Sequence, residues 1–427
     1  MKARNAYAVI TYNGHNIKTQ LKDYATAFEY NDPAEGESDT IAITVADPDS
    51  RWIGAWIPTK GDQITAKIFY ENKDGDGKTS KIDCGSFLLD DFSYSESTGG
   101  RALTISAIGA PLDDAFKATE RTQNWQGVTL KKIAKTIADR YNMGLIFDGD
   151  DIPLNKKQQD KTTDAAFLED LTKKYGYMLK LYQKKIVIYD REAYKKKETA
   201  ATISRSQMTN FSWKTTLAGT YTGAEIKYTD NEKNETINFK VGGGKRILQL
   251  NEKVDNGEDA RRIATAAMNN ANHEMTTASF STMGRPDLVA GQNILISNFA
   301  KLSGKYHINK KTDSLSGSGY ISNFEVSLIS ADSDAVAKEA IDRLYYLGVI
   351  DKPDYWKSSL KKVKSLSELF INAGASIKTV SNKDSSNASD YIKVLADRGV
   401  VNTPEYWRKQ DYPYLQTLLE KIARAVL

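Results

Sequence analysis

The chain has 427 residues, which at roughly 100 to 200 residues per domain predicts about three domains rather than one core. Hydrophobic residues make up 40% and charged residues 27%, and no stretch approaches the roughly 20 consecutive apolar residues of a membrane span, which excludes an integral membrane protein. Cys84 is the single cysteine, which excludes an intrachain disulfide framework and a cysteine-rich metal site. No apolar run follows Lys2 and Arg4, so we expect no secretion signal and synthesis in a cytoplasm.

The charge is close to balance. The 59 basic and 55 acidic residues leave a formal net charge of +4, which provides no basic footprint for sequence-specific nucleic-acid readout. His15, His273 and His307 are the only histidines, and their wide separation leaves no zinc-binding signature. Since histidine is the usual catalytic base, the composition favours a binding or structural protein over an enzyme.

The first region has the pattern of antiparallel strands. Residues 7–107 alternate apolar and polar side chains in short runs, as in 41–45 and 64–70, between clusters of Gly, Asn, Asp and Pro. We predict a first β domain at residues 1–112.

The second region mixes helix and strand patterns. Apolar residues recur at helical spacing over 130–141, behind Thr129, whose hydroxyl suits a helix N-cap. A second helical run over 167–175 stops at Gly176, a residue type suited to the left-handed end of a helix, and two strand patterns follow. The prediction for residues 113–204 is a small α+β module.

Alternation returns in the third region. Apart from a helix-like stretch at 259–268, strand patterns continue to residue 328 and are separated by turn sequences such as Ser316-Gly317-Ser318-Gly319. We predict a second β domain at residues 205–332.

The end of the chain contains an internal repeat. Its copies match at positions 51 residues apart: Gly348 and Gly399, Pro353 and Pro404, Tyr355 and Tyr406, Trp356 and Trp407. Each copy predicts a helical hairpin whose second helix starts at the proline. We therefore predict tandem helical repeats at residues 333–427, with a flexible Ser-rich joint near 374–390 that has too few large apolar side chains to become ordered.

Several short motifs invite catalytic or metal-binding interpretations. Asn72, Asp74, Asp76, Gly77 and Asp83 have the spacing of a calcium loop, but both flanks alternate like strands, so we interpret the segment as a hairpin turn. The run Gly242-Gly243-Gly244-Lys245 lacks the earlier glycine and the following hydroxyl residue of a phosphate-binding loop.

The sequence also contains no clear set of residues for nucleophilic or acid–base catalysis. Cys84 lies in an apolar strand pattern without a nearby base, which favours a buried structural cysteine. Paired aspartates such as Asp90-Asp91 point to opposite faces of a strand and predict no joint active site. The sequence thus predicts no catalytic residue, no metal ligand and no cofactor.

Motifs in both β regions resemble one family. The third region contains Gly284-x-Pro286-x-Leu288-x-x-Gly291-x-x-Ile294-x-Ile296, then Ser303-Gly304-x-Tyr306-x-Ile308, then Gly319-Tyr320-x-Ser322-x-Phe324. In order and spacing these resemble the tube-type barrel of phage baseplate hub proteins, the late-control-D family. The first region, through Tyr12-Asn13-Gly14, Trp52 with Trp56, Lys60-Gly61-Asp62 and Cys84-Gly85-x-Phe87, is similar to the first barrel of hubs from Gram-positive contractile tails. The resemblance covers about residues 5–332.

This resemblance implies a fold and an assembly. The fold is mainly β with α+β: two tube-type antiparallel β-barrel domains, an α+β module between them and the C-terminal tandem helical-hairpin region. Three copies of a chain with two similar barrels present six rims to a sixfold tail tube, and the opposite threefold face can seat a spike. The implied protein is a homotrimeric, non-enzymatic baseplate hub adaptor of a contractile phage tail or phage-tail-like bacteriocin, located in that particle and assembled in the host cytoplasm.

The resemblance also indicates candidate contact residues. Assembly-interface candidates are Gly291, Gly304, Gly319, Tyr320, Trp52 and Trp56. The C-terminal repeats lie outside this resemblance, and their candidates for docking on a tape-measure, spike or other baseplate protein are Tyr355, Trp356, Tyr406 and Trp407. Two alternatives stay open: a tail-associated cell-wall hydrolase, and binding to the cell wall or membrane through the repeats.

Overall fold

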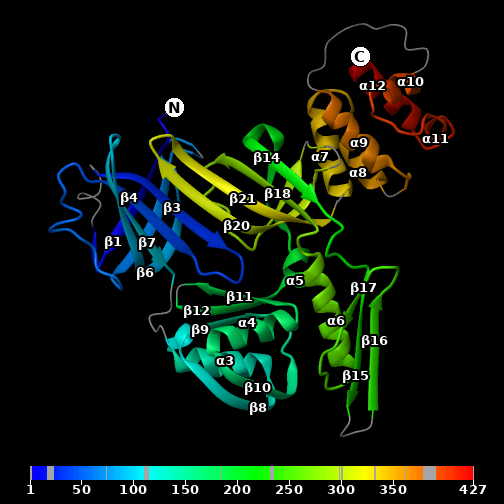
Figure 1. Ribbon diagram of the computed structural model, residues 1–427. Coiled ribbons are helices and arrows are strands. Elements are labelled where there is room, and N and C mark those ends of the chain that lie inside the picture. Colours follow the sequence, from blue (N-terminus) through cyan, green and yellow to red (C-terminus); the bar gives the residue numbers. More distant parts are fainter. Residues whose placement is uncertain are drawn as a thin grey trace. The chain divides into compact units, whose positions relative to one another are not determined.

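The computed structural model describes residues 2–16, 24–73, 75–109, 115–182, 184–230, 235–297, 299, 302–330, 333–360, 362–377 and 391–426 (Figure 1). Its residues fall into two units. The first unit comprises Met1–Glu198, Thr209–Gln292 and His307–Ser327, and the second comprises Thr199–Met208, Asn293–Tyr306 and Leu328–Leu427. Strands dominate and helices gather at the C-terminus, which confirms the predicted mainly β class with an α+β module and a helical end.

In the described residues before position 110, the first unit contains strands joined by turns and loops, as predicted. Its strands are β1 (Asn5–Tyr12), β2 (His15–Asn16), β3 (Ala25–Pro33), β4 (Thr40–Ala46), β5 (Gln63–Glu71), β6 (Thr79–Ser97) and β7 (Gly100–Ile108). Burial alternates along β4 and β5, so each strand places one row of apolar side chains in the core. Strands β5 and β6 flank the calcium-like segment, which confirms the hairpin interpretation. Asp74 lies outside the described residues.

The α+β module follows. Its elements are α2 (Ala115–Ala118), β8 (Glu120–Thr129), α3 (Leu130–Arg140), β9 (Gly144–Asp148), β10 (Pro153–Thr163), α4 (Asp164–Lys174), β11 (Tyr177–Tyr182), β12 (Lys185–Asp190) and α5 (Arg191–Lys196). The Thr129 hydroxyl accepts a hydrogen bond from the Lys132 amide at 3.2 Å, so the predicted N-cap is confirmed. Gly176 has a φ of +80°, which suits its place after α4.

The second β region of the chain contains β14 (Met208–Thr215), β18 (Thr276–Met283), β20 (Gly304–Ser316) and β21 (Gly319–Ser330). Together with the N-terminal strands they form one continuous path, in the order β14-β18-β21-β20-β3-β4-β7-β6-β5-β1-β2. Leu315 and Tyr320 belong to the same buried core as Phe28 and Tyr70, so the two β regions share side-chain packing.

One inserted segment differs from the sequence interpretation. Strands β15 (Gly223–Asp230), β16 (Glu235–Gly242) and β17 (Ile247–Leu250) form a separate sheet, and α6 (Gly257–Asn272) packs beside it. Ile226 and Ile263 join the buried core of the α+β module, which also holds Phe167. Residues 223–230 and 235–272 therefore belong to the module by packing, although the sequence prediction placed them, with the helix-like stretch at 259–268, in the second β domain.

The second unit contains the strands β13 and β19 and the C-terminal helices. Strand β13 (Thr199–Ser204) pairs in parallel with β19 (Asn293–Ser297), and the one-turn helix η1 (Arg205–Gln207) follows β13. The sequence prediction placed β13 in the α+β module. Its pairing with β19 was not predicted, because the residue pattern of a strand does not reveal which strand it pairs with. The helices are α7 (Ser333–Tyr346), α8 (Pro353–Ser359), α9 (Leu366–Ser376), α10 (Tyr391–Asp397), α11 (Pro404–Arg408) and α12 (Leu415–Val426).

The helices confirm the repeat, but each copy contains three described helices where a hairpin was predicted, because the segment that begins at the proline is divided into a short helix and a longer one. Pro353 and Pro404 each occupy the first turn of a helix, and Gly348 and Gly399 have φ values of +71° and +69° after the preceding helices. Much of the predicted Ser-rich joint, residues 378–390, lies outside the described residues. No helix in the described ranges is long and apolar enough to cross a membrane.

Candidate assembly interface

Strands β20 and β3 lie side by side and join the two β regions of the first unit (Figure 1). The strands are antiparallel, with Leu315 opposite Phe28. Asp313 lies opposite Tyr30 in the same register. We call this pairing the internal seam. It shows that an edge of one β region can complete the sheet of the other.

The strands on the two sides of the internal seam follow the same order. One side reads β3-β4-β7-β6 and the other reads β14-β18-β21-β20. Strands β6 and β7 form a hairpin in which Ser97 pairs with Gly100, and β20 and β21 are joined between Ser316 and Gly319 with the same spacing. Strand β20 therefore corresponds to β6.

Strand β14 corresponds to β3 in the same way. Two side-chain hydrogen bonds fix its register on β18: Asn210 to Ser281 at 2.9 Å, and Thr215 with Thr276 at 2.9 Å. Strands β4 and β18 face β7 and β21 at equal distances from the two hairpin turns. It follows that Phe211-Ser212-Trp213 of β14 occupies the positions of Phe28-Glu29-Tyr30 in β3, and the aromatic alternation is the same.

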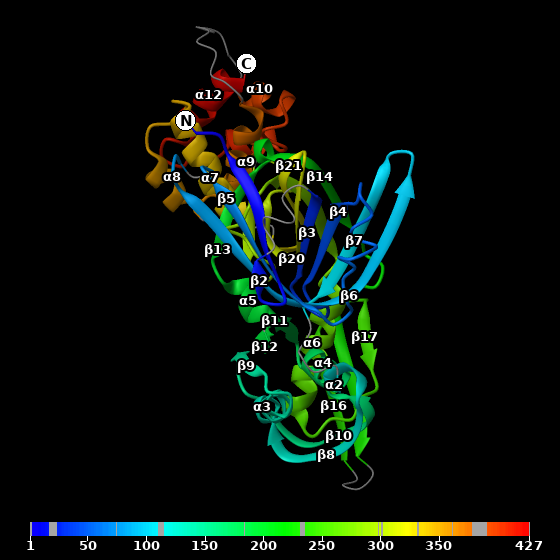
Figure 2. The same cartoon turned by 90° about the vertical axis from the view of Figure 1, so that its left-hand side faces the viewer.

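Several strand edges in the first unit lack a neighbouring strand among the described residues, and two of them belong to the strands that correspond to β20 and β3. One is the outer edge of β14, which begins the strand path. The other is the outer edge of β6 over residues 91–97, since β5 pairs only as far as Leu88 and β7 covers one side alone. Figure 2 shows the β6–β7 hairpin extending past the strands beside it. Such edges are templates for pairing with another chain.

An aromatic loop connects β4 with β5. Trp52 is buried, whereas Trp56 is 38% exposed and its ring meets the rings of Trp52 and Tyr24 edge to face at 5.5 and 5.9 Å. The Arg51 guanidinium lies 5.3 Å from the Trp56 ring centroid. Ile57 is 51% exposed, so the loop presents apolar surface of the kind found at protein contacts. The two predicted tryptophans therefore have different surroundings, and an interface role for them stays a prediction.

The other predicted interface residues lie in turns, at the start of a strand or in the buried core. Gly291 and Gly319 have φ values of +87° and +106°, which only glycine adopts without strain, and Gly304 begins β20. Tyr320 is buried and packs edge to face on Tyr70 at 5.3 Å. These contacts account for the motif residues within the fold, and their part in assembly stays a prediction.

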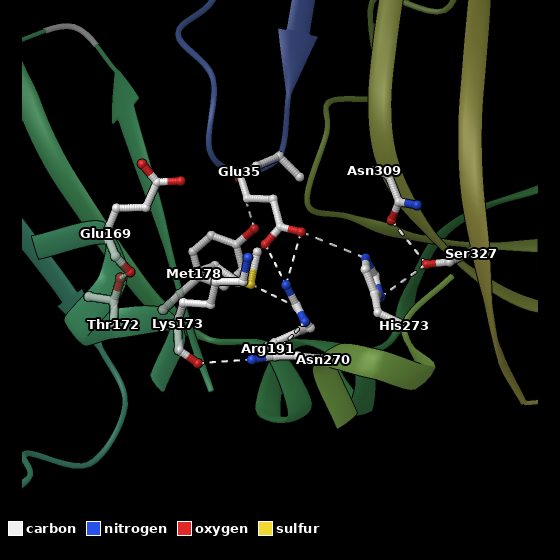
Figure 3. A network of polar contacts seen from close by, with 12 residues as sticks. Glu35, Glu169, Thr172, Lys173, Met178, Arg191, Asn270, His273, Asn309 and Ser327 are labelled. Atoms are coloured by element: carbon white, nitrogen blue, oxygen red, sulfur yellow. Dashed lines mark hydrogen bonds and ion pairs between the residues drawn. The ribbon is translucent and has the colours of Figure 1, made fainter. Parts of the chain in front are cut away.

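A polar network, which we call the Arg191 clamp, holds the α+β module to both β regions of the first unit (Figure 3). Arg191, at the start of α5, donates to both carboxylate oxygens of Glu35, at 2.9 and 2.6 Å, and to Asn270 of α6 at 2.6 Å. His273 Nε2 lies 3.8 Å from Glu35 Oε1, and His273 Nδ1 lies 3.5 Å from the Ser327 hydroxyl. The clamp thus gathers side chains from four segments far apart in the sequence.

The two buried histidines are held neutral. Burial, together with the nearby charges of Arg191 and Lys195, lowers the pKa of His273 to about 3. Burial and the same two cations lower the pKa of His307, whose ring lies 6.4 Å from that of His273, to about 4. Both imidazoles therefore act as neutral hydrogen-bonding and packing groups at neutral pH.

A second buried cluster ties β11 to β3. Lys180 forms ion pairs with Asp32 and, at 3.2 Å, with Asp39. The Tyr30 hydroxyl donates to Asp39 at 2.8 Å, and the Ala290 amide donates to Asp32 at 2.8 Å. Burial raises the pKa of Asp39 to about 6, although the Lys180 charge acts in the opposite direction. This cluster fixes domain geometry in the same manner as the Arg191 clamp.

The C-terminal docking candidates also divide by burial. Trp356 and Trp407 lie in the helical core with 5% and 3% exposure, whereas Tyr355 and Tyr406 are half-buried. The tryptophans therefore stabilise the repeats, and a docking role for any of the four residues stays a prediction.

Sequence reasoning did not identify Arg191, Glu35 or Lys180. Arg191 and Glu35 are 156 residues apart, and neither lies in a motif with a characteristic spacing. An isolated charged residue gives no local signal of burial, so only the tertiary structure could identify these contacts.

No protein-family model and no curated protein matches the sequence. Among solved structures, the chain is similar to the 43 kDa tail protein of prophage MuSo2 from Shewanella oneidensis, with a TM-score of 0.57, 16% identity, and coverage of 77% of this chain and 99% of that one. It is also similar to a tail protein from Neisseria meningitidis MC58, with a TM-score of 0.57, 12% identity, and coverage of 76% and 97%. The chain therefore has the fold of phage tail proteins.

Proposed function

We propose that this chain is a structural, non-enzymatic subunit of a baseplate hub, a ring that joins a tail tube to a spike in a contractile phage tail or phage-tail-like bacteriocin. The observation that carries this proposal is the repeated strand order across the internal seam. The fold shared with phage tail proteins supports it.

The internal seam suggests how copies would join. Strand β20 pairs with β3, and their counterparts β6 and β14 have the two uncovered edges described above. Pairing β6 of one copy with β14 of the next repeats the same seam head to tail. A head-to-tail interface closes into a ring when its rotation allows, and a closed ring covers these two edges in every copy. Three copies then contribute six β regions of tube-type barrel form.

This ring would adapt one symmetry to another. Six similar β regions suit a sixfold tube protein on one face, and three chains suit a trimeric spike on the other. The exposed Trp56 loop and the C-terminal helices are the candidate surfaces for these and other baseplate neighbours. The Arg191 clamp and the Lys180 cluster would keep the α+β module fixed while such contacts carry load.

The correspondence of strands predicts a residue-level register. Ser95 of β6 corresponds to Ser314 of β20, and Ser212 of β14 corresponds to Glu29 of β3. Ser314 and Glu29 are directly opposite in the internal seam. We therefore expect Ser95 to lie opposite Ser212 of the next copy, within reach of a disulfide if both are cysteines.

The test combines cross-linking with mass measurement. A Ser95→Cys/Ser212→Cys chain should form covalent dimers and closed trimers on oxidation, and light scattering of the unmodified chain should show three times the 47.5 kDa chain mass. A Glu29→Cys/Ser314→Cys chain is the matched control, because its disulfide forms within one chain and leaves the mass unchanged. Ser95→Cys alone should form no ladder. A monomeric chain that gives no cross-link, alone or with tube protein, would contradict the ring.

A further inference from the structure

The two C-terminal repeats contact each other reciprocally. The Tyr355 hydroxyl donates to the Pro413 carbonyl at 3.0 Å, and the Tyr406 hydroxyl donates to the Lys364 carbonyl at 2.9 Å. The tyrosines are equivalent in the repeat, and each acceptor lies two residues before the third helix of the other repeat. The same contact is thus made twice with the roles exchanged, as around a pseudo-twofold axis.

This symmetry relates two equivalent places between the repeats, and their residues differ. The first lies between the start of α8 and the start of α12 and encloses a volume of about 240 Å³. Lys352 and Tyr414 line it, whereas Thr403 and Ser365 hold the equivalent positions between α11 and α9. Of the two equivalent places, only the groove between α8 and α12 therefore combines a cation with an aromatic ring at these positions.

The backbone of Tyr414 has an unfavourable φ angle, and burial of the side chain does not compensate for it. Its φ is +62°, in the left-handed region where bulky residues are rare, and its counterpart Ser365 has the same φ. The Tyr414 side chain is 63% exposed. Lys352 Nζ lies 5.5 Å from its ring centroid, and the Tyr355 ring meets it edge to face at 5.7 Å. The left-handed φ belongs to the turn in both repeats, so the feature specific to this site is a bulky, exposed aromatic ring that its neighbours hold in place at a position better suited to glycine.

The polar lining favours a negatively charged ligand. Lys421 pairs with Asp351 at 2.7 Å, and Lys352 adds a second cation, so the groove has a net positive charge. The exposed Thr417 contributes a hydroxyl. A sugar ring has an apolar C–H face that suits an aromatic side chain, while its hydroxyl and anionic groups suit lysine and threonine.

We propose that the groove between α8 and α12 binds a saccharide that carries a negative charge. The ring would lie against Tyr414, and Lys352 would contact a carboxylate or phosphate substituent. This inference concerns the repeats alone and holds whether or not the hub ring forms, so failure of one test leaves the other unaffected.

The test is calorimetric titration of the full chain with three sugars that share one ring. They are N-acetylglucosamine, which is neutral, N-acetylmuramic acid, which adds a carboxylate, and N-acetylglucosamine 1-phosphate. We expect at least one anionic sugar to bind about tenfold more tightly than the neutral sugar, and its identity distinguishes a peptidoglycan source from a phosphate-bearing glycan. Absence of binding, or equal binding of the neutral sugar, would overturn the proposal.

Paired variants separate binding from folding. Lys352→Gln should weaken binding of the anionic sugar about tenfold. Tyr414→Gly should abolish it while leaving thermal stability unchanged or higher, because glycine suits the left-handed backbone. Thr403→Ala and Ser365→Gly are the matched controls at the equivalent positions between α11 and α9 and should leave the affinity unchanged. Equal losses in these controls, or binding to anionic lipid vesicles that Tyr414→Gly does not reduce, would contradict the assignment.

Discussion

Acid should weaken the first unit through its two buried histidines. His273 and His307 have pKa values lowered to about 3 and about 4 from an ordinary value near 6.5, chiefly by burial. The unfolded chain therefore binds protons at both rings before the folded chain does. Their contribution to stability is complete above pH 6.5 and is lost as the pH falls from 6.5 towards the folded-state values.

The size of the effect follows from the linkage between pKa and stability. Each pH unit below 6.5 costs about 1.4 kcal/mol per histidine until the folded-state pKa is reached. Between pH 7 and pH 5 the loss is therefore about 2 kcal/mol for each ring and about 4 kcal/mol for both, a large share of the roughly 5 to 15 kcal/mol of a typical domain. Asp39, whose pKa is raised to about 6, changes stability in the opposite direction over this range, so the histidine effect must be isolated by comparison.

The assay is urea unfolding of the full chain at pH 7 and pH 5, followed by tryptophan fluorescence. His273→Gln should be less stable than wild type at pH 7, but the difference should shrink by about 2 kcal/mol at pH 5. His307→Gln should show the same change in stability difference between pH 7 and pH 5. In the double variant the two changes should add. His15→Gln is the matched control, since His15 is exposed, and should track the wild type. If the double variant lost as much stability in acid as the wild type, the imidazoles would not be the cause.

Three further predictions concern packing and hydrogen bonds, each measured by thermal or urea unfolding. Lys311→Met should destabilise by about 3 to 5 kcal/mol, since it leaves the buried Asp313 without its partner at 2.7 Å, and adding Asp313→Leu should recover most of the loss. Gly284→Ala should cost about 1 to 3 kcal/mol, because a Cβ there would lie 2.1 Å from the Tyr320 ring, and an unchanged midpoint would contradict that contact. Tyr355→Phe should cost about 0.5 to 1.5 kcal/mol through the lost hydrogen bond between the repeats, and a neutral result would argue against the pseudo-twofold contact.

Much of the local structure could be predicted from sequence. The N-cap at Thr129, the helix end at Gly176 and the proline helix starts at Pro353 and Pro404 all depend on residues close in the chain, and all are confirmed. The strand regions were also predicted, because alternation along a strand reflects its one buried face. The placement of residues 223–272 was not, since alternation does not reveal which core receives the buried face.

Residue pattern and spacing therefore determined the β and helical regions, the C-terminal repeat and the turns between strands. Only the tertiary structure decided that β20 completes the sheet beside β3, that Arg191 meets Glu35, and that Tyr414 lines a groove between the two repeats. The reason is physical: propensities, caps and turns act over a few residues, whereas an edge pairing or a buried charge depends on partners brought close only when the whole chain has folded.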